Sequence, residues 1–243
     1  MISVRTYRLP KLGNSDEECE DAFSSNGNFS RMAIADGASD SIFSGVWASS
    51  LVDEFARIEG RLYDDTGQVL SQLITAARNS WYDRINWKKL SLFVKNKAIK
   101  GSFSTFLGVE IEKTPEGYIT YASAVGDSCL ITKNDGAINS VPINVPSEFN
   151  STPQLIWSGY GAPFSREFKW KKPVMQKFAF NFIEGSTFML ATDALSKWML
   201  EHRKDSWETL INTENPGEYF DLLRKRKEMR NDDVTLAIVT LDP

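Results

Sequence analysis

A run of strand signals between residues 103 and 142, with no helix signal inside it, constrains the fold of this chain most. β-branched, aromatic and small apolar residues dominate four segments of it, at residues 103–112, 117–125, 128–133 and 136–142. Turn residues separate these segments, as Pro115-Glu116-Gly117, Gly126-Asp127 and Asn134-Asp135-Gly136. Connections this short join antiparallel strands, because a parallel pair needs a crossover of a dozen or more residues. We therefore expect an antiparallel meander in the middle of the chain.

Strand and helix signals outside this run extend the pattern. Strands are expected at residues 2–9, which read as an edge strand, and at 20–25, 29–36, 174–182, 186–192 and 233–241. Helices are expected at residues 41–58, 67–86, 194–203, 205–212 and 216–229. Residues 87–100 are basic and ambiguous, and residues 143–173 read as a long irregular surface segment. Because helices do not alternate with the strands, we predict an α+β fold, a layered β-sandwich of antiparallel sheets with helices packed outside.

The length and composition predict a single domain over residues 1–243. A chain of 243 residues with 42% apolar content can bury one sizeable core. No apolar run approaches the length of a membrane span, and the N-terminus lacks the apolar centre of a signal peptide. The formal net charge of −4 disfavours a nucleic-acid partner. We therefore expect a cytoplasmic monomer with no membrane or nucleic-acid partner.

Two smaller features each allow a structural and a functional interpretation. Cys19 and Cys129 do not make a disulfide framework, and we interpret them as small buried hydrophobic residues rather than as redox groups or metal modulators. The basic run at residues 224–227, with Arg230 nearby, reads as a solvated helix face. The alternative is a docking patch for an acidic or phosphorylated partner.

The single histidine of the chain excludes several kinds of active site. A Ser-His-Asp triad needs a histidine as its base, but His202 lies in a charged segment and no G-x-S-x-G motif is present. Zinc sites require several His or Cys ligands, and phosphate-binding glycine loops are absent as well. Carboxylates must therefore carry any chemistry, and we interpret His202 as an exposed residue at a helix end.

Three aspartates stand at the ends of predicted strands. Asp36 ends the strand at 29–36, Asp193 follows the strand at 186–192, and Asp232 precedes the last strand. In antiparallel neighbours, the end of one strand lies beside the start of the next. The pattern therefore allows all three acids to gather at one sheet edge.

A predicted hairpin adds Glu20 and Asp21, which open the strand that leads into an Asn-Gly turn. A strict two-residue turn would pair Asp21 with Met32, four positions short of Asp36. The hairpin therefore needs a wider loop or a bulge if the two aspartates are to lie side by side.

Clustered carboxylates repel one another unless a positive charge neutralises them. A pair of divalent cations would do so, and ligation by oxygen alone selects Mg²⁺ or Mn²⁺ rather than zinc. Two such ions about 3.5–4 Å apart acidify a bridging water and stabilise the charge that develops on phosphate oxygens. For any single aspartate, ordinary turn or cap chemistry is the better explanation. The argument for a metal site therefore rests on the set of acids.

Six short motifs occur in order along the chain. They are Glu20-Asp21-Ala22-Phe23, Ala35-Asp36-Gly37-Ala38-Ser39, Gly101-Ser102-Phe103-Ser104-Thr105-Phe106, Gly126-Asp127-Ser128, Ala191-Thr192-Asp193-Ala194-Leu195 and Asn231-Asp232-Asp233-Val234-Thr235. In that order they resemble the metal-dependent protein phosphatases of the protein phosphatase 2C type, and the resemblance runs from Glu20 to Val239. It implies a β-sandwich flanked by pairs of helices (α-β-β-α) and the hydrolysis of phosphoserine and phosphothreonine in proteins.

The resemblance also implies a cofactor and its ligands. Two ions, Mg²⁺ or Mn²⁺, would share the ligand Asp36, and the carbonyl of Gly37 would bind one of them. Asp193 and Asp232 would hold the other ion. The only catalytic group implied is a metal-bound water, and the partner implied is a phosphorylated protein substrate.

Three further acids have weaker roles by the same resemblance. Glu20 and Asp21 would act near the site, partly through waters. Asp127 matches the ligand of a third, weaker metal ion. The segment 143–173 corresponds loosely to a variable flap that would set substrate choice.

One position departs from the family pattern. Many members carry an arginine that binds substrate phosphate five residues before the second acid of the opening motif, and here that position is Asp16. Arg5, Arg8 and Lys11 are candidates to replace it. The departure supports an alternative, a catalytically weak phosphoprotein-binding regulatory module on the same fold. A small-molecule phosphatase is a third reading, with the same chemistry and a different substrate.

Overall fold

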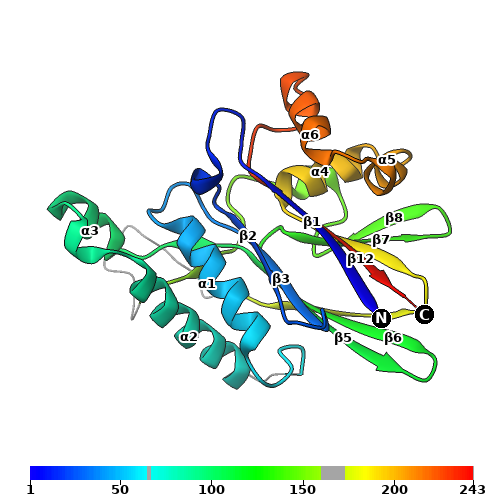
Figure 1. Cartoon of the computed structure of the whole chain (residues 1–243), viewed down its shortest axis with the longest axis horizontal. Helices are drawn as coiled ribbons and strands as arrows, with labels where there is room; N and C mark the ends of the chain where they lie inside the picture. Colours follow the sequence, from blue (N-terminus) through cyan, green and yellow to red (C-terminus); the bar gives the residue numbers. More distant parts are fainter. Residues whose placement is uncertain (65–66, 160–172, 243) are drawn as a thin grey trace.

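Two five-stranded antiparallel sheets form the centre of the molecule (Figure 1). The computed structural model describes residues 1–64, 67–159 and 173–242. The order in the first sheet is β1 (Ile2–Leu9), β12 (Val234–Leu241), β11 (Thr187–Ala191), β7 (Cys129–Asn134) and β8 (Ala137–Val141). The order in the second sheet is β10 (Gln176–Phe182), β6 (Gly117–Val125), β5 (Phe106–Thr114), β3 (Arg31–Asp36) and β2 (Asp21–Ser25). A short pair, β4 (Phe103–Ser104) with β9 (Ile156–Trp157), forms a separate two-stranded sheet, and Ser104 forms a bridge with Gly37 just after β3.

Helices cover the outer face of each sheet. The second sheet is covered by α1 (Ser44–Arg57) and α2 (Gln68–Arg84). The first sheet is covered by α4 (Asp193–Glu201), α5 (Ser206–Asn212) and α6 (Pro216–Lys225). A further helix, α3 (Leu92–Ala98), projects beyond the end of α2 (Figure 1). The predicted α-β-β-α sandwich is therefore confirmed, and so is the edge position of β1, which pairs with β12 alone.

The alternation of side chains along each strand separates three cores. Met32 and Ile34 of β3 are fully buried between the sheets, where Phe188 of β11 belongs to the same core. Ala33 and Ala35 face the other way, into the core beneath α1 and α2. Because successive side chains of a strand point to opposite faces, one strand serves two layers.

The prediction of one meander over residues 103–142 is wrong in one respect. β5 pairs with β6 in the second sheet, whereas β7 pairs with β8 in the first. The turn at Gly126-Asp127 therefore carries the chain from one sheet to the other. Gly126 has φ +99°, and a Cβ there would lie 2.7 Å from Cγ2 of Thr105, so only glycine fits this crossing. Alternation shows which residues are buried, but it does not show which sheet buries them.

The ambiguous and irregular segments take simple forms. Residues 87–100 form a 3-10 turn at Trp87–Lys89 followed by α3. Of the predicted irregular segment 143–173, the structure describes residues 143–159 and Pro173, and residues 160–172 lie outside the described residues. The regular elements in residues 143–159 are a 3-10 turn at Pro146–Glu148 and β9. None of the described helices combines the length and apolarity needed to cross a bilayer.

Three sequence interpretations of single residues are confirmed. Cys19 and Cys129 are both buried and neither is in a disulfide. Burial raises the pKa of the Cys19 thiol to about 12 and that of Cys129 to about 11, so both stay protonated and unreactive at neutral pH. His202 is exposed at the C-terminal cap of α4, where its ring stacks on Trp198.

Candidate active site

The acidic motifs meet at one end of the sandwich. Asp36 ends β3 of the second sheet, while Asp193 follows β11 and Asp232 precedes β12 in the first sheet. Burial raises the pKa of Asp36 well above its ordinary range, and the charges of four other aspartates raise it further; they are Asp21, Asp193, Asp232 and Asp127. The acids therefore gather across the ends of two sheets, not along one sheet edge as the sequence pattern suggested.

The β2–β3 hairpin places two of these aspartates directly opposite each other. Asp21 pairs with Asp36 in the strand register. The loop between the strands spans residues 26–30, and the backbone N–H of Asn26 donates to the carbonyl of Arg31 at 2.9 Å. This confirms the expectation that the hairpin uses a loop wider than two residues to align the acids.

Hydrogen bonds and a close backbone approach fix the Asp36-Gly37 segment. The N–H of Asp36 donates to Thr105 Oγ1 at 3.0 Å, and the N–H of Gly37 donates to the Glu20 carbonyl at 3.2 Å. A Cβ at residue 37 would lie 2.6 Å from the carbonyl carbon of Ser44, which no side chain tolerates. Glycine is therefore required at residue 37, where the Asp36-Gly37 segment packs against the backbone of Glu20 and Ser44.

Two buried carboxylates carry oxygens with no hydrogen-bond partner among the described residues. Asp21 is 1% exposed and accepts a 2.9 Å hydrogen bond at Oδ2 from Thr192 Oγ1, but its Oδ1 has none. Asp127 is 3% exposed, and its Oδ1 has none either. A buried polar atom without a partner is costly, so these oxygens are suited to accept a cation or an ordered water.

Arg230 holds the two acids of the first sheet. Its Nη2 lies 2.7 Å from Oδ2 of Asp232, and its Nη1 lies 3.3 Å from Oδ2 of Asp193. The arginine side chain remains 64% exposed, beside a cavity of about 430 Å³ that Asp193 and Lys197 also line. Sequence reasoning placed Arg230 with a solvated basic run, because nothing in the local sequence shows that it folds back onto the aspartates.

The basic run itself is not uniformly solvated. The guanidinium of Arg224 is fully buried and donates to the carbonyls of Pro10 and Asp232, at 3.0 and 2.7 Å. Residues 225–227 are exposed. The interpretation of this run as a solvated helix face is therefore wrong for Arg224, which fixes the backbone next to the candidate ligand Asp232.

The structure does not bring the Glu20 carboxylate into the aspartate cluster. Both of its oxygens accept hydrogen bonds from serine hydroxyls, Oε2 from Ser39 and Oε1 from Ser44. Lys11 Nζ lies 3.6 Å from Oε2. Glu20 therefore belongs to the rim of the site, with its charge already compensated.

Asp233 is a residue that the sequence analysis missed. It is 4% exposed and accepts two backbone hydrogen bonds of 2.8 Å, from Lys11 N at Oδ1 and from Glu20 N at Oδ2. It thereby ties the opening motif to the start of β12. The sequence signal that could have found it is the pair of adjacent acids, Asp232 and Asp233, at the start of the last strand. Neighbouring side chains of a strand point to opposite faces, so two adjacent acids are expected to have different partners.

Two of the three candidate replacements for the phosphate-binding arginine are committed elsewhere. The guanidinium of Arg8 donates to the carbonyls of Asp21, Asp16 and Cys19 at 2.9, 3.2 and 3.3 Å. It acts as a clamp on the backbone of the opening motif. Arg5 donates to the carbonyl of Ile211 at 3.2 Å, at the end of α5.

Lys11, the third candidate, lies beside the opening motif. Its Nζ lies 3.4 Å from Ser39 Oγ, next to Glu20. A cavity of about 630 Å³ opens here, lined by Lys11 and Glu20 together with Phe43 and Arg84. An anion entering this cavity would meet the Lys11 ammonium.

The electrostatics of the aspartate cluster fit a bound cation. Burial first, and neighbouring carboxylates second, raise the pKa values of Asp21, Asp36 and Asp193 above their ordinary range and that of Asp127 to about 7. Across the described ranges, however, no three His, Cys, Asp or Glu side chains are already arranged as a metal site. Arg230 instead pairs with two of the acids, Asp193 and Asp232.

Comparisons with known proteins agree with this geometry. No curated protein matched the chain in a sequence comparison. Similar solved structures include PppA, described as a key regulatory component of T6SS in Pseudomonas aeruginosa, at 16% identity and a TM-score of 0.59, covering 98% of this chain and 97% of that one. They also include the Mycobacterium tuberculosis serine/threonine phosphatase PstP/Ppp, at 14% identity and a TM-score of 0.60, covering 100% of this chain and 99% of that one. The serine/threonine phosphatase Stp1 from Staphylococcus aureus is similar too, at 14% identity and a TM-score of 0.60, covering 100% of this chain and 96% of that one.

At these identities the structural matches show the fold alone. The family model described as Protein phosphatase 2C matches residues 13–225, which is most of the chain and includes the first five acidic or Ser/Thr motifs. Asp232 lies just beyond the matched range. The chain belongs to the protein phosphatase 2C family.

Proposed function

We propose that this protein hydrolyses phosphoserine and phosphothreonine in proteins, with a metal-activated water as the nucleophile. Membership of the protein phosphatase 2C family supports phosphatase activity. The observation that carries the metal-dependent mechanism is the concentration of negative charge around Asp36, with unpartnered buried oxygens on Asp21 and Asp127. Asp21 and Asp36 form no ion pair among the described residues, so this part of the cluster is suited to accept a cation from solution.

The proposed ligands follow the positions of the acids. Asp36 and the Gly37 carbonyl would hold one ion, and Asp193 and Asp232 would hold a second together with Asp36. Asp127 would serve a third, weaker site. The all-oxygen donor set suits Mg²⁺ or Mn²⁺, and when bound these ions acidify a water and stabilise charge on phosphate oxygens.

The protein's own residues position these groups. Thr105 fixes the backbone of Asp36, and Thr192 fixes the carboxylate of Asp21. Asp233 and Arg8 hold the opening motif, so that Glu20 stays at the rim. Burial of the carboxylates keeps the local dielectric low, which strengthens their attraction for a cation.

We assign substrate phosphate binding to Lys11. Its ammonium lines the larger of the two cavities and has only long contacts, 3.6 Å to Glu20 and 3.4 Å to Ser39, whereas the guanidinium groups of Arg5 and Arg8 donate to backbone carbonyls. A lysine binds phosphate as a point charge. Lys11 would thus compensate for the acid at position 16.

The test measures hydrolysis of p-nitrophenyl phosphate and of a phosphothreonine peptide, with Mn²⁺ and with EDTA. We expect activity that requires the metal, prefers the peptide, and falls by more than about 100-fold in Asp193→Asn because a ligand is lost. Asp205→Asn is the matched control, since Asp205 is an exposed residue at the start of α5. Turnover that survives both EDTA and Asp193→Asn would refute the metal-based mechanism.

One observation favours a second function, a phosphoprotein-binding module without turnover. Arg230 neutralises Asp193 and Asp232, so this half of the site holds together without an ion. Peptide binding in EDTA, with no turnover in Mg²⁺ or Mn²⁺, would favour the module. A preference for p-nitrophenyl phosphate over the peptide would instead favour a small-molecule phosphatase.

A further inference from the structure

Residues 87–100 form a projecting element, called here the α3 knob. It consists of the 3-10 turn Trp87–Lys89, α3, and the residues through Lys100. Figure 1 shows α3 at the left end of the molecule, away from α4, α5 and α6. Of the α3 residues only Ala98 is buried, so this helix contributes little to any core.

The knob exposes large apolar side chains. Leu92 is 75% exposed, Phe93 is 69% exposed and Ile99 is 63% exposed. Single exposed apolar residues are common on protein surfaces, but several within one short projecting element mark an interaction site.

The same element is strongly basic. Between residues 87 and 100 there are five lysines and no acid, although the whole chain has a net charge of −4. The lysines are Lys88, Lys89, Lys95, Lys97 and Lys100. The neighbouring cation Arg84, at the end of α2, is paired with Asp53 at 2.7 Å, while Asp83 is an exposed acid close to the knob. The knob is therefore a positively charged patch on a protein of net negative charge.

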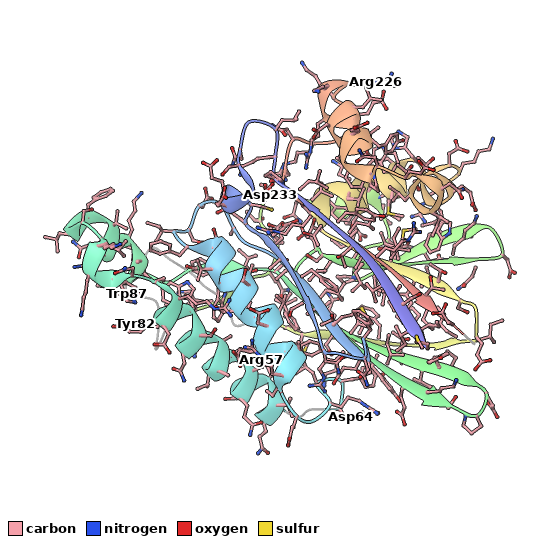
Figure 2. The ribbon with its side chains drawn as sticks, viewed as in Figure 1. Arg57, Asp64, Tyr82, Trp87, Arg226 and Asp233 are labelled. Carbon is pink, nitrogen blue, oxygen red and sulfur yellow. The ribbon has the colours of Figure 1, made fainter. Side chains whose placement is uncertain are left out.

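Ring contacts hold the base of the knob in place. Trp87 stacks on Tyr82 with 4.9 Å between ring centroids, and its Nε1 donates to the Tyr82 carbonyl at 2.8 Å (Figure 2). Ser91 caps α3 by accepting from the N–H of Val94 at 3.3 Å. The apolar side chains are thus presented to solvent by a structured element.

We infer that the α3 knob docks the protein peripherally on an anionic lipid surface. Lysines combined with Phe and Leu are typical of elements that lie in a membrane interface, where the apolar groups enter the headgroup layer and the cations meet anionic lipids. Protein–protein interfaces, by contrast, are enriched in arginine and depleted in lysine, and the knob has five lysines and no arginine. The sequence alone led us to expect no membrane partner, and the exposure of Leu92, Phe93 and Ile99 is what changes that expectation.

The test is co-sedimentation of the full chain with vesicles of phosphatidylcholine, with or without phosphatidylglycerol. We expect binding only to the phosphatidylglycerol vesicles, and we expect it to weaken as salt is raised. The double variant Lys88→Glu/Lys89→Glu should lower the partition coefficient by at least about tenfold, since each lysine near the surface contributes severalfold. Leu92→Ser/Phe93→Ser should lower it by a similar factor at unchanged charge.

The matched control is Lys225→Glu/Arg226→Glu on α6. It makes the same charge change at exposed positions far from the knob, at the top of the molecule where Figure 2 labels Arg226, and it should leave vesicle binding nearly unchanged. An equal loss in this control would reduce the effect to net charge and overturn the inference. Absence of binding to anionic vesicles would overturn it too, as would binding of the knob to a polyglutamate peptide in place of vesicles, which would indicate an acidic protein partner. Circular dichroism and unchanged hydrolysis of p-nitrophenyl phosphate would show that the variants are folded.

Discussion

The two halves of the candidate site neutralise their acids in different ways. In the half at the ends of the second sheet, Asp21 and Asp36 face each other, and within the described residues neither forms an ion pair. In the half at the ends of the first sheet, Arg230 contacts both Asp193 and Asp232. The comparison teaches that an ion bound in the first of these halves would supply a positive charge that the half lacks, whereas an ion bound in the second would compete with Arg230.

The largest expected effect comes from removing the charge of Asp36, in the half of the site whose acids form no ion pair among the described residues. Asp36→Asn should lower phosphatase activity and Mn²⁺ affinity by more than about 100-fold, because the proposed shared ligand is lost. In EDTA the same variant should melt at a higher temperature than the wild type, since four neighbouring aspartates no longer repel it. Calorimetric titration and thermal unfolding measure the two effects. Asp40→Asn, at an exposed position of the same loop, is the control, and a lower melting temperature for Asp36→Asn would contradict the repulsion argument.

A smaller effect is expected where the two halves touch. Thr192 precedes α4, yet its Oγ1 donates to Asp21 Oδ2 at 2.9 Å and accepts from Thr235 N at 3.0 Å. Thr192→Val should lower the free energy of unfolding by about 1–3 kcal/mol, because a buried donor and acceptor are lost. Thr192→Ser keeps the hydroxyl and should recover most of this loss in urea unfolding. Equal losses in the two variants would attribute the effect to packing instead.

Beside the half that holds Asp21 and Asp36, Lys11 lies next to Glu20 and is the proposed phosphate-binding residue. Lys11→Met should raise KM for the phosphothreonine peptide by about tenfold or more, since a charge-assisted contact to phosphate is lost, while the Mn²⁺ dissociation constant changes little. Lys11→Arg should retain most of the affinity. Arg5→Met is the control, because Arg5 contacts the carbonyl of Ile211 away from the cavity. A fall in kcat at unchanged KM would argue against phosphate binding by Lys11.

The smallest effect is expected in the half where Arg230 contacts Asp193 and Asp232. Arg230→Gln should tighten Mn²⁺ binding by about threefold, because the ion no longer displaces an exposed ion pair. Arg226→Gln removes an exposed arginine elsewhere, and should leave the affinity unchanged. Weaker Mn²⁺ binding in Arg230→Gln would show that the arginine supports the ligands rather than competing for them.

The sequence predicted the layers and the acids because both depend on local pattern. The apolar run Met32-Ala33-Ile34-Ala35 identified a strand, and Asp36 was visible as its end. The width of the hairpin loop followed from counting residues between the two acids. Such features need only the period of a strand and the chemistry of a turn.

The features that the sequence did not predict depend on contacts between distant segments. Nothing near Gly126 indicates that the next strand joins the other sheet. The burial of Arg224 depends on carbonyls at Pro10 and Asp232, and the bridge from Arg230 depends on how the loop before β12 folds back. The sequence left residues 87–100 ambiguous, and the structure shows that Leu92, Phe93 and Ile99 of this segment are exposed.

The crossing turn at Gly126-Asp127 has a consequence for stability. Because the candidate ligands come from the ends of both sheets, an ion bound among them would add a further link between two layers that already meet through an apolar core and through hydrogen bonds such as that from Thr192 to Asp21. Its binding free energy would then add to the cohesion of the sandwich, by about 1.4 kcal/mol for each tenfold excess of free ion over its dissociation constant. The supply of divalent cation would thereby govern how long the folded protein persists, as well as how fast it turns over substrate.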